Sequence, residues 1–336
     1  MFARRQWVVL LVSLGVSELA ASTSASRAEA YVRYRGSNGV PWSWPGTTCL
    51  PIVAYPHAFT RMPVQEVSAA AMNAAAAWSS SETSCTYLGL SMTLSDEPGP
   101  VAIPVAEGVV VFRTDKWCWL LDDGTCSTKP QDLATHQTNT LMLTTLATNT
   151  ATGQIVQAAT EVNAVDATWG DLVSHPELLQ GQQGAVHDLQ NALTHELGHF
   201  IGLDHNCVVD DTQKERPIDD TGQPAPSCKD APASITEATM FYQSEPGDLE
   251  KRTLAADDTR ALCDIYPAAH GPGRCVPPDG KVHHAAGGCA CDVGTPSPSP
   301  SPSPSPSNAL ASAALGLVSL AWAFARRASR RPAPFC

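Results

Sequence analysis

The chain has 336 residues and a formal net charge of −12, which is long enough for one good-sized domain with appendages. Seven of its 21 basic residues lie near the two ends, which leaves residues 31–295 with 14 basic and 31 acidic side chains, a net charge of −17. A body this acidic argues against nucleic acid and anionic membrane surfaces as partners. Its acidic surface either keeps the protein soluble or favours basic substrates.

The first 30 residues predict an export signal. Arg4 and Arg5 precede a short apolar stretch, Trp7 to Val16, and Ala28-Glu29-Ala30 forms a small-x-small cleavage site. Cleavage there makes Tyr31 the first residue of the exported protein. The alternative is an uncleaved anchor, which the short apolar stretch disfavours.

Eleven cysteines in an exported chain predict disulfide bonds. A cysteine metal site is the competing hypothesis, and it is weak because no CxxC pair occurs. Cys289, Cys291 and Cys336 have no obvious local partner. The pairs expected from proximity in the sequence are Cys49–Cys85, Cys118–Cys126, Cys207–Cys228 and Cys263–Cys275.

Residues 31–267 predict an α+β domain. Strands are expected at short apolar or β-branched runs, and helices at longer runs with helix-favouring residues. The predicted strands are Leu50–Tyr55, Leu88–Leu94, Val109–Arg113, Thr140–Ala147 and Gly153–Val165. The predicted helices are Val64–Trp78, Leu189–Ile201, which ends at Gly202, and Thr253–Ile265, which Pro267 stops.

Beyond residue 267 the composition changes. Residues 268–294 are rich in cysteine and glycine and predict a small irregular segment. Residues 295–308 alternate serine and proline, which is typical of an extended spacer. Residues 309–325 carry no charge, and the basic segment 326–336 follows at once, which predicts a short membrane span with a cytoplasmic tail. The alternative is a weakly hydrophobic tail, since alanine is only mildly apolar.

One stretch carries most of the chemical information. Residues 195–205 read HELGHFIGLDH and match HExxHxxGxxH in full. Residues four apart lie on one helix face, so His195 and His199 can reach one metal ion. Gly202 can adopt a left-handed conformation and turn the chain, which brings His205 back as a third ligand. Glu196 lies beside the first ligand and can face a water molecule on the metal.

These residue types suit hydrolysis. Three neutral imidazoles leave an open position on zinc, which lowers the pKa of a bound water and polarises a carbonyl. Glu196 then serves as general base and passes the proton to the leaving amine. The alternative is a helix with solvated histidines, which the apolar positions of a buried helix disfavour: Leu193, Leu197, Phe200 and Ile201.

The motif is that of the metzincins, and the chain resembles the matrixin-like peptidases among them. Ala238-Thr239-Met240, 35 residues after His205, resembles the Met-turn, whose methionine underlies the zinc site. Residues 254–267 resemble the closing helix of matrixins, and residues 153–163 resemble the edge strand that pairs with extended substrate. The resemblance implies a metzincin-like peptidase domain with a twisted mixed sheet, an active-site helix, the Met-turn and a C-terminal helix.

The resemblance also implies one catalytic Zn²⁺ and a protein or peptide substrate. The PRCGxPD segment of many matrixins is missing, so Cys49 is interpreted as a disulfide partner and not as a cysteine switch. The family's loop for structural zinc and calcium is not visible either, so calcium has no support and a single metal is predicted.

For two further side chains, Tyr242 and His187, the sequence leaves two interpretations. Tyr242 follows Met240 with the M-x-Y spacing of astacins and serralysins, in which the tyrosine approaches the metal and helps to stabilise the oxyanion. The alternative is a tyrosine that only packs. His187 lies two helical turns before His195; it is expected to be exposed, and the alternative is that it neighbours the site. The other histidines show no ligand spacing.

The C-terminal region resembles the sorting tails called MYXO-CTERM, because Gly288-Cys289-Ala290-Cys291 precedes a short span and an arginine cluster. That resemblance implies processing near the span, and the alternative is a simple one-span anchor. Either arrangement leaves the protein exported, at the cell surface or outside the cell.

The sequence therefore predicts a zinc-dependent endopeptidase of extracellular proteins with His195, His199 and His205 as metal ligands and Glu196 as the base. A surface adhesion or binding module that only keeps a zinc site is the alternative, and the intact Glu196 argues against it. A zinc hydrolase of cell-wall amides is a third hypothesis.

Overall fold

The structure is a computed structural model, and it describes residues 30–46, 49–79, 83–103, 107–133, 135–180, 185–210, 212 and 216–270. The predicted export signal, the Ser-Pro spacer, the membrane span and the basic tail lie outside the described residues. No helix within the described ranges is long and apolar enough to cross a membrane.

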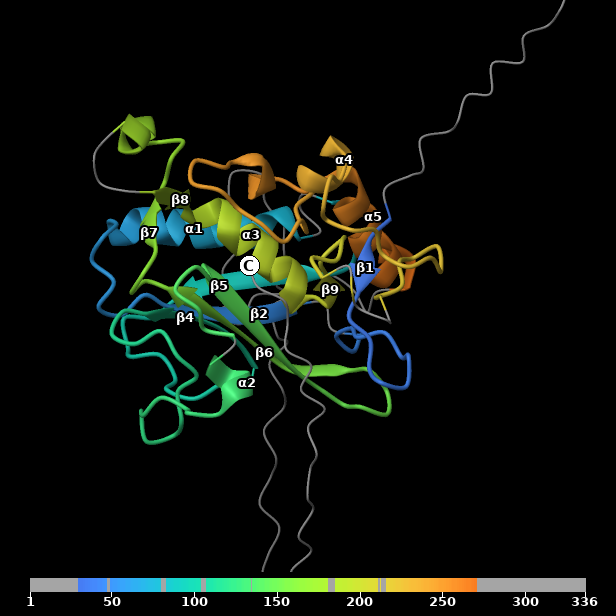
Figure 1. The fold of residues 1–336 in the computed structure, drawn as a ribbon, viewed down its shortest axis with the longest axis horizontal. Coiled ribbons are helices and arrows are strands. Elements are labelled where there is room, and N and C mark those ends of the chain that lie inside the picture. The colour runs from blue at the N-terminus through green and yellow to red at the C-terminus, as the bar shows by residue number, and fades with distance from the viewer. Residues whose placement is uncertain are drawn as a thin grey trace, which may run out of the picture.

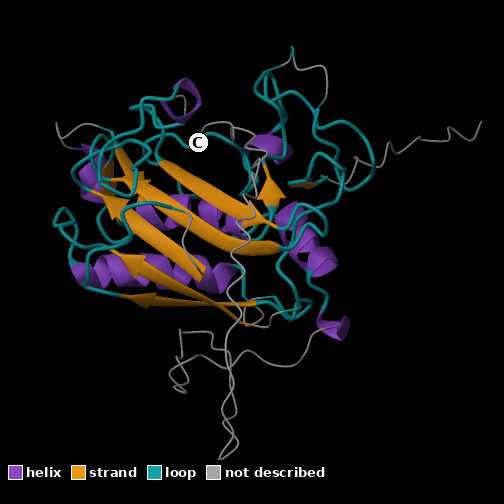
Figure 2. Ribbon diagram, turned by 90° about the horizontal axis from the view of Figure 1, so that it is seen from below, coloured by secondary structure: helices purple, strands orange, loops and turns teal. Residues whose placement is uncertain are grey.

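A five-stranded mixed sheet forms the centre of the domain, as the α+β prediction requires (Figure 2). Each predicted strand is present, with ends that differ from the prediction by no more than two residues. Four strands are parallel, and the last in the order, β5, is antiparallel to its neighbour. The order β3-β2-β4-β6-β5 runs through Gly89–Leu94, Cys49–Tyr55, Glu107–Arg113, Ile155–Asn163 and Met142–Thr148.

The expectation that residues 153–163 form the edge of the sheet is wrong. β6 lies between β4 and β5, with Glu161 opposite Val111 on one side and Thr160 opposite Thr144 on the other. Small and β-branched residues predict a strand but do not determine its place in the sheet. The edge strand next to β6 is β5, which pairs with β6 alone, and β3 forms the other edge of the sheet.

Two helices pack together on one face of this sheet (Figures 1 and 2). α1 (Val64–Ala77) contacts β3, and α3 (Leu189–Phe200) contacts β5 and β6. The inward positions of α1 are mostly alanines, whose small side chains allow close helix packing. Trp78 at its end is fully buried and donates from Nε1 to the carbonyl of Thr194 over 2.7 Å.

Loops cover the opposite face of the sheet. Beneath them Arg113 and His136 both contact the carboxylate of Glu161, and all three residues are buried. The guanidinium also donates to the carbonyls of Pro100 and Val101. A charged group is tolerated inside a protein when it is paired and hydrogen-bonded in this way.

The remaining elements are short and were not predicted, apart from the C-terminal helix. α4, α5, β1 and β9 lie to one side of α3 (Figure 1). α5 (Ala256–Ile265) begins three residues later than expected, and a separate 3₁₀ turn, η2 (Glu250–Arg252), precedes it. The others are β1 (Val32–Arg33), α2 (Pro130–Leu133), β7 (Thr168–Gly170), η1 (Pro176–Gln180), β8 (Val186–Asp188), β9 (Leu203–Asp204), α4 (Ala233–Thr236) and η3 (Ala268–His270).

Two of the four expected disulfides are confirmed, Cys118–Cys126 and Cys207–Cys228. The other two are wrong, because Cys85 pairs with Cys263 across 178 residues. The reason is that the end of α5 lies beside residues 85–87, where Tyr87 donates from its backbone N–H to the carbonyl of Tyr266. Cys49 is disulfide-bonded as well, so its thiol is not available to a metal.

Gly198 lets α3 approach the turn at Met240. A Cβ atom at Gly198 would lie 2.2 Å from Sδ of Met240 and 2.9 Å from Cζ2 of Trp78. Met240 is buried in the main core. A glycine in a helix normally lowers stability, and here it is required because the side chains beneath it leave no room for a methyl group.

We predict that Gly198→Ala destabilises the protein by about 1–3 kcal/mol through overpacking. Helix propensity alone would stabilise such a variant by about 1 kcal/mol. Urea unfolding measures the difference, and Gly46→Ala is the control because no atom lies within 4 Å of a Cβ built there. A Gly198→Ala protein as stable as its parent would contradict the packing described here.

Candidate metal centre

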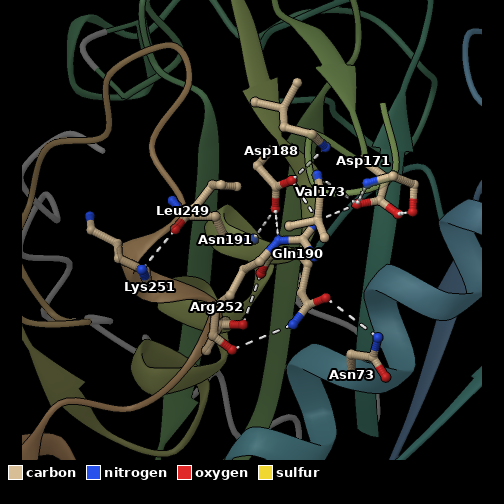
Figure 3. Close-up of polar contacts among 12 residues, drawn as sticks. Asn73, Asp171, Val173, Asp188, Gln190, Asn191, Leu249, Lys251 and Arg252 are labelled. Atoms are coloured by element: carbon tan, nitrogen blue, oxygen red, sulfur yellow. Dashed lines mark hydrogen bonds and ion pairs between the residues drawn. The ribbon is translucent and has the colours of Figure 1, made fainter. Parts of the chain in front are cut away.

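The helix that carries the motif begins at a fixed point. Asp188 caps α3 by accepting from the backbone N–H of Asn191 over 2.8 Å. The same carboxylate accepts two hydrogen bonds from Arg252, which also contacts Asp171 (Figure 3). A charge-assisted cap of this kind holds the first turn in place, and the histidines project from the turns that follow.

The three predicted metal ligands come together. His195, His199 and His205 are all buried, and one nitrogen of each lies within 4.8 Å of the others. Nε2 of His199 is 3.1 Å from Nε2 of His205. Two nitrogens on one tetrahedral zinc lie about 3.3 Å apart, so this separation fits two ligands of one ion. Among the described residues, no other group of three or more His, Cys, Asp or Glu side chains approaches this closely.

Backbone carbonyls orient two of the rings. Nδ1 of His195 lies 2.6 Å from the carbonyl of Thr239, and Nδ1 of His199 lies 2.9 Å from the carbonyl of Leu203. A carbonyl only accepts, so each Nδ1 carries the hydrogen and each Nε2 keeps its lone pair. Contacts of this kind are the usual outer support of metal-binding histidines.

Burial keeps the rings neutral. Desolvation lowers the pKa of His195 and of His205 well below the usual range and lowers that of His199 to about 4. Three neutral imidazoles with convergent lone pairs are a donor set that suits a divalent transition metal. The residues present therefore fit a metal ion.

Gly202 makes the predicted turn. Its φ is +100°, in the region that favours glycine, and a Cβ atom there would lie 2.7 Å from the carbonyl oxygen of Trp42. After the turn, β9 pairs antiparallel with β1. His205 follows β9 directly and faces His195 and His199 of α3. The glycine in the motif is thus required both for the turn and for the close approach of the N-terminal segment.

Glu196 is buried next to the first ligand. One of its carboxylate oxygens accepts from the hydroxyl of Thr144 on β5 over 2.6 Å. Thr144 also contacts the hydroxyl of Thr160 on β6 over 2.8 Å. The edge strand of the sheet therefore positions the predicted base, a role for Thr144 that no motif indicated.

The turn at Met240 is tied to both sides of the site. The carbonyl of Thr239 accepts from His195, and its backbone N–H donates to Asp258 on α5 over 2.9 Å. Met240 accepts from the backbone N–H of Asn206, next to the third ligand. The methionine itself is buried, and the geometry places its turn directly behind the histidines.

Tyr242 lies near the predicted metal ligands. Its ring centre is 6.3 Å from that of His205, and the side chain is half-buried. It lines a narrow pocket together with His195 and Glu196. A role for its hydroxyl in stabilising charge stays a prediction.

The structure corrects the expectation for one histidine. His187 is half-buried and not exposed, with its ring 6.0 Å from that of Trp169. Burial lowers its pKa, while Asp248 and Glu245 act in the opposite direction.

Tyr34 contacts the site and was missed in the sequence. Its hydroxyl lies 3.3 Å from Nδ1 of His199, and its backbone N–H donates to the carbonyl of Gly202 over 3.0 Å. It comes from the first residues of the domain, 165 positions before its partner in the chain. Such a separation carries no pattern that sequence reasoning can detect.

Comparison with models of protein families finds none that matches the chain, and a comparison with curated proteins finds no match either.

We predict that Tyr34→Phe weakens metal binding, by up to about 10-fold, because it removes a contact that orients His199. Competition with a chelator measures the affinity. Tyr55→Phe is the matched control, since Tyr55 packs against Val109 and Val111 on the other face of the sheet. Equal metal affinity in Tyr34→Phe and its parent would show that Leu203 alone orients the ring.

A second prediction concerns the buried carboxyl of Asp258. Burial, with help from Asp257, raises its pKa from 3.8 to about 7. The folded protein therefore holds this proton more tightly than the unfolded chain. The free energy of unfolding consequently declines as the pH rises from 3.8 to about 7. In the metal-free protein, Asp258→Asn should reduce the decline between pH 5 and pH 8 by about 2 kcal/mol.

Denaturant unfolding at the two pH values measures this change. The control is Asp264→Asn, an exposed acid on the same helix. The account of Asp258 is wrong when both variants show the pH dependence of the parent.

Proposed function

We propose that this chain is a zinc-dependent endopeptidase of the metzincin type, similar to the matrixins, that hydrolyses extracellular proteins. The observation that carries the proposal is the group of three buried, neutral imidazoles beside a buried glutamate. Hydrolysis at a metal centre requires a set of residues that hold the metal and a base beside them that can accept a proton from water.

Each of these residues has a separate role in the proposed mechanism. His195, His199 and His205 would hold zinc through Nε2. Zinc supplies the positive charge that polarises the scissile carbonyl and makes water acidic. Glu196 takes a proton from the attacking water and delivers it to the leaving amine. Thr144 donates to the carboxylate over 2.6 Å and so fixes its orientation.

The edge strand supports a peptide as the substrate. β5 pairs on one side only, and its outer backbone groups can accept an extended chain as an added strand. Met142 of β5 lines the pocket beside Glu196, and Thr144 of the same strand contacts that carboxylate. A peptide paired along β5 would therefore pass the metal centre.

Disulfide bonds among the described residues support the proposal that the protein is exported. Three disulfides join residues 85 and 263, 118 and 126, and 207 and 228. Disulfides persist in oxidising compartments, which fits a protein that leaves the cytoplasm. Its sorting or anchoring at the cell surface follows from the resemblance of the C-terminal region.

We predict that Glu196→Gln retains zinc and loses peptidase activity by about 10²–10⁴-fold, because it removes only the base. Zinc content and cleavage of casein or gelatin are measured on protein made under oxidising conditions. Glu97→Gln is the matched control, since Glu97 is exposed.

Full activity in a zinc-loaded Glu196→Gln protein would refute the mechanism. If both the parent and the variant hold zinc and neither cuts any protein substrate, the second candidate function, a surface binding module that keeps its zinc site, is favoured.

A further inference from the structure

A narrow pocket opens beside the proposed base. His195 and Glu196 line one side of it, Met142 of the edge strand contributes an apolar wall, and Tyr242 and Lys251 complete it. Its volume is about 10 Å³, which is about the space that one water molecule needs. Only a short side chain or the tip of a longer one can enter.

Lys251 is an unusual residue for such a wall, because lysine is almost never fully buried without partners. Only 4% of Lys251 is exposed. Its ammonium donates to the backbone carbonyls of Phe241 and Gln243, the second over 2.8 Å. These carbonyls lie on either side of Tyr242, so the lysine also holds the segment that carries the tyrosine.

The backbone of Lys251 is fixed as well. Its N–H donates to Oδ1 of Asn191 over 2.7 Å (Figure 3), and Nδ2 of Asn191 donates to Ser244 over 3.1 Å. Asn191 belongs to the first turn of α3. The positive charge is therefore held in a defined place relative to the metal ligands and cannot swing out to solvent as a surface lysine does.

The charge of Lys251 reaches the metal centre. Lys251 lines the same pocket as His195 and Glu196. A divalent metal and Lys251 together contribute three positive charges, and Glu196 contributes one negative charge. The loaded site is therefore positive, in a body whose net charge is −17.

We propose that Lys251 makes this pocket select a carboxylate on the substrate residue next to the scissile bond, with aspartate favoured because the pocket is narrow. The inference rests on the proposed peptidase function and names the substrate class for that site. Opposite charges attract strongly when water is excluded, and a charge-assisted contact discriminates against a neutral isostere. A free terminal carboxylate has the same chemistry and is the other possible source.

The test uses the full chain and matched peptides that carry aspartate or asparagine at either position flanking the scissile bond. The expected kcat/KM is at least about 10-fold higher for one aspartate peptide than for its asparagine twin. A third peptide ends in a free carboxylate at that position, and its amide is the control. Faster cleavage of the free acid than of the aspartate peptide would assign the carboxylate to the chain terminus.

Lys251→Gln should bring the aspartate-to-asparagine ratio close to one, whereas Lys251→Arg should preserve much of it. The ratio is informative because loss of a merely structural contact lowers cleavage of both peptides equally. A ratio near one in the parent overturns the proposal, and so does an unchanged ratio in Lys251→Gln.

Binding provides a readout apart from turnover. The zinc-loaded Glu196→Gln protein should bind the aspartate peptide more tightly than the asparagine peptide, and adding Lys251→Gln should remove the difference. A parent that cuts no peptide contradicts the peptidase function, while this binding comparison still decides for or against Lys251.

Discussion

The hydrogen bond between His195 and the carbonyl of Thr239 is the contact on which the site depends. It fixes the tautomer of the first ligand and joins two segments that are 44 residues apart. The backbone N–H of the same residue donates to Asp258. The two backbone polar groups of Thr239 therefore connect α3, the turn at Met240 and the C-terminal helix, and a shift of any of these elements moves the imidazole.

Other parts of the domain pack closely around this arrangement. Gly198 allows Met240 and Trp78 to pack directly under the ligand helix. Tyr34 and Trp42, from the N-terminal segment, close over the turn at Gly202. Burial is what keeps the imidazoles neutral, and neutral imidazoles are the form that binds metal. The close packing around the histidines therefore also keeps them in the protonation state that metal binding requires.

The sequence predicted what depends on local spacing. The helix at residues 189–200 and the turn at Gly202 follow from helical periodicity and from the backbone freedom of glycine, and the structure has both. Pairings between distant segments could not be predicted. Cys85 meets Cys263 because α5 packs beside the start of β3, and Thr144 reaches Glu196 because β5 packs against α3. Lys251 also became significant only when its surroundings were known.

The central claim is that three imidazoles bind one metal ion through Nε2. X-ray absorption at the zinc edge, on protein made under oxidising conditions and loaded with one equivalent of zinc, tests it most directly. The account predicts nitrogen ligands at about 2.0–2.1 Å, with the multiple-scattering pattern of three imidazoles. A sulfur shell at about 2.3 Å, or fewer than three imidazoles, would contradict it.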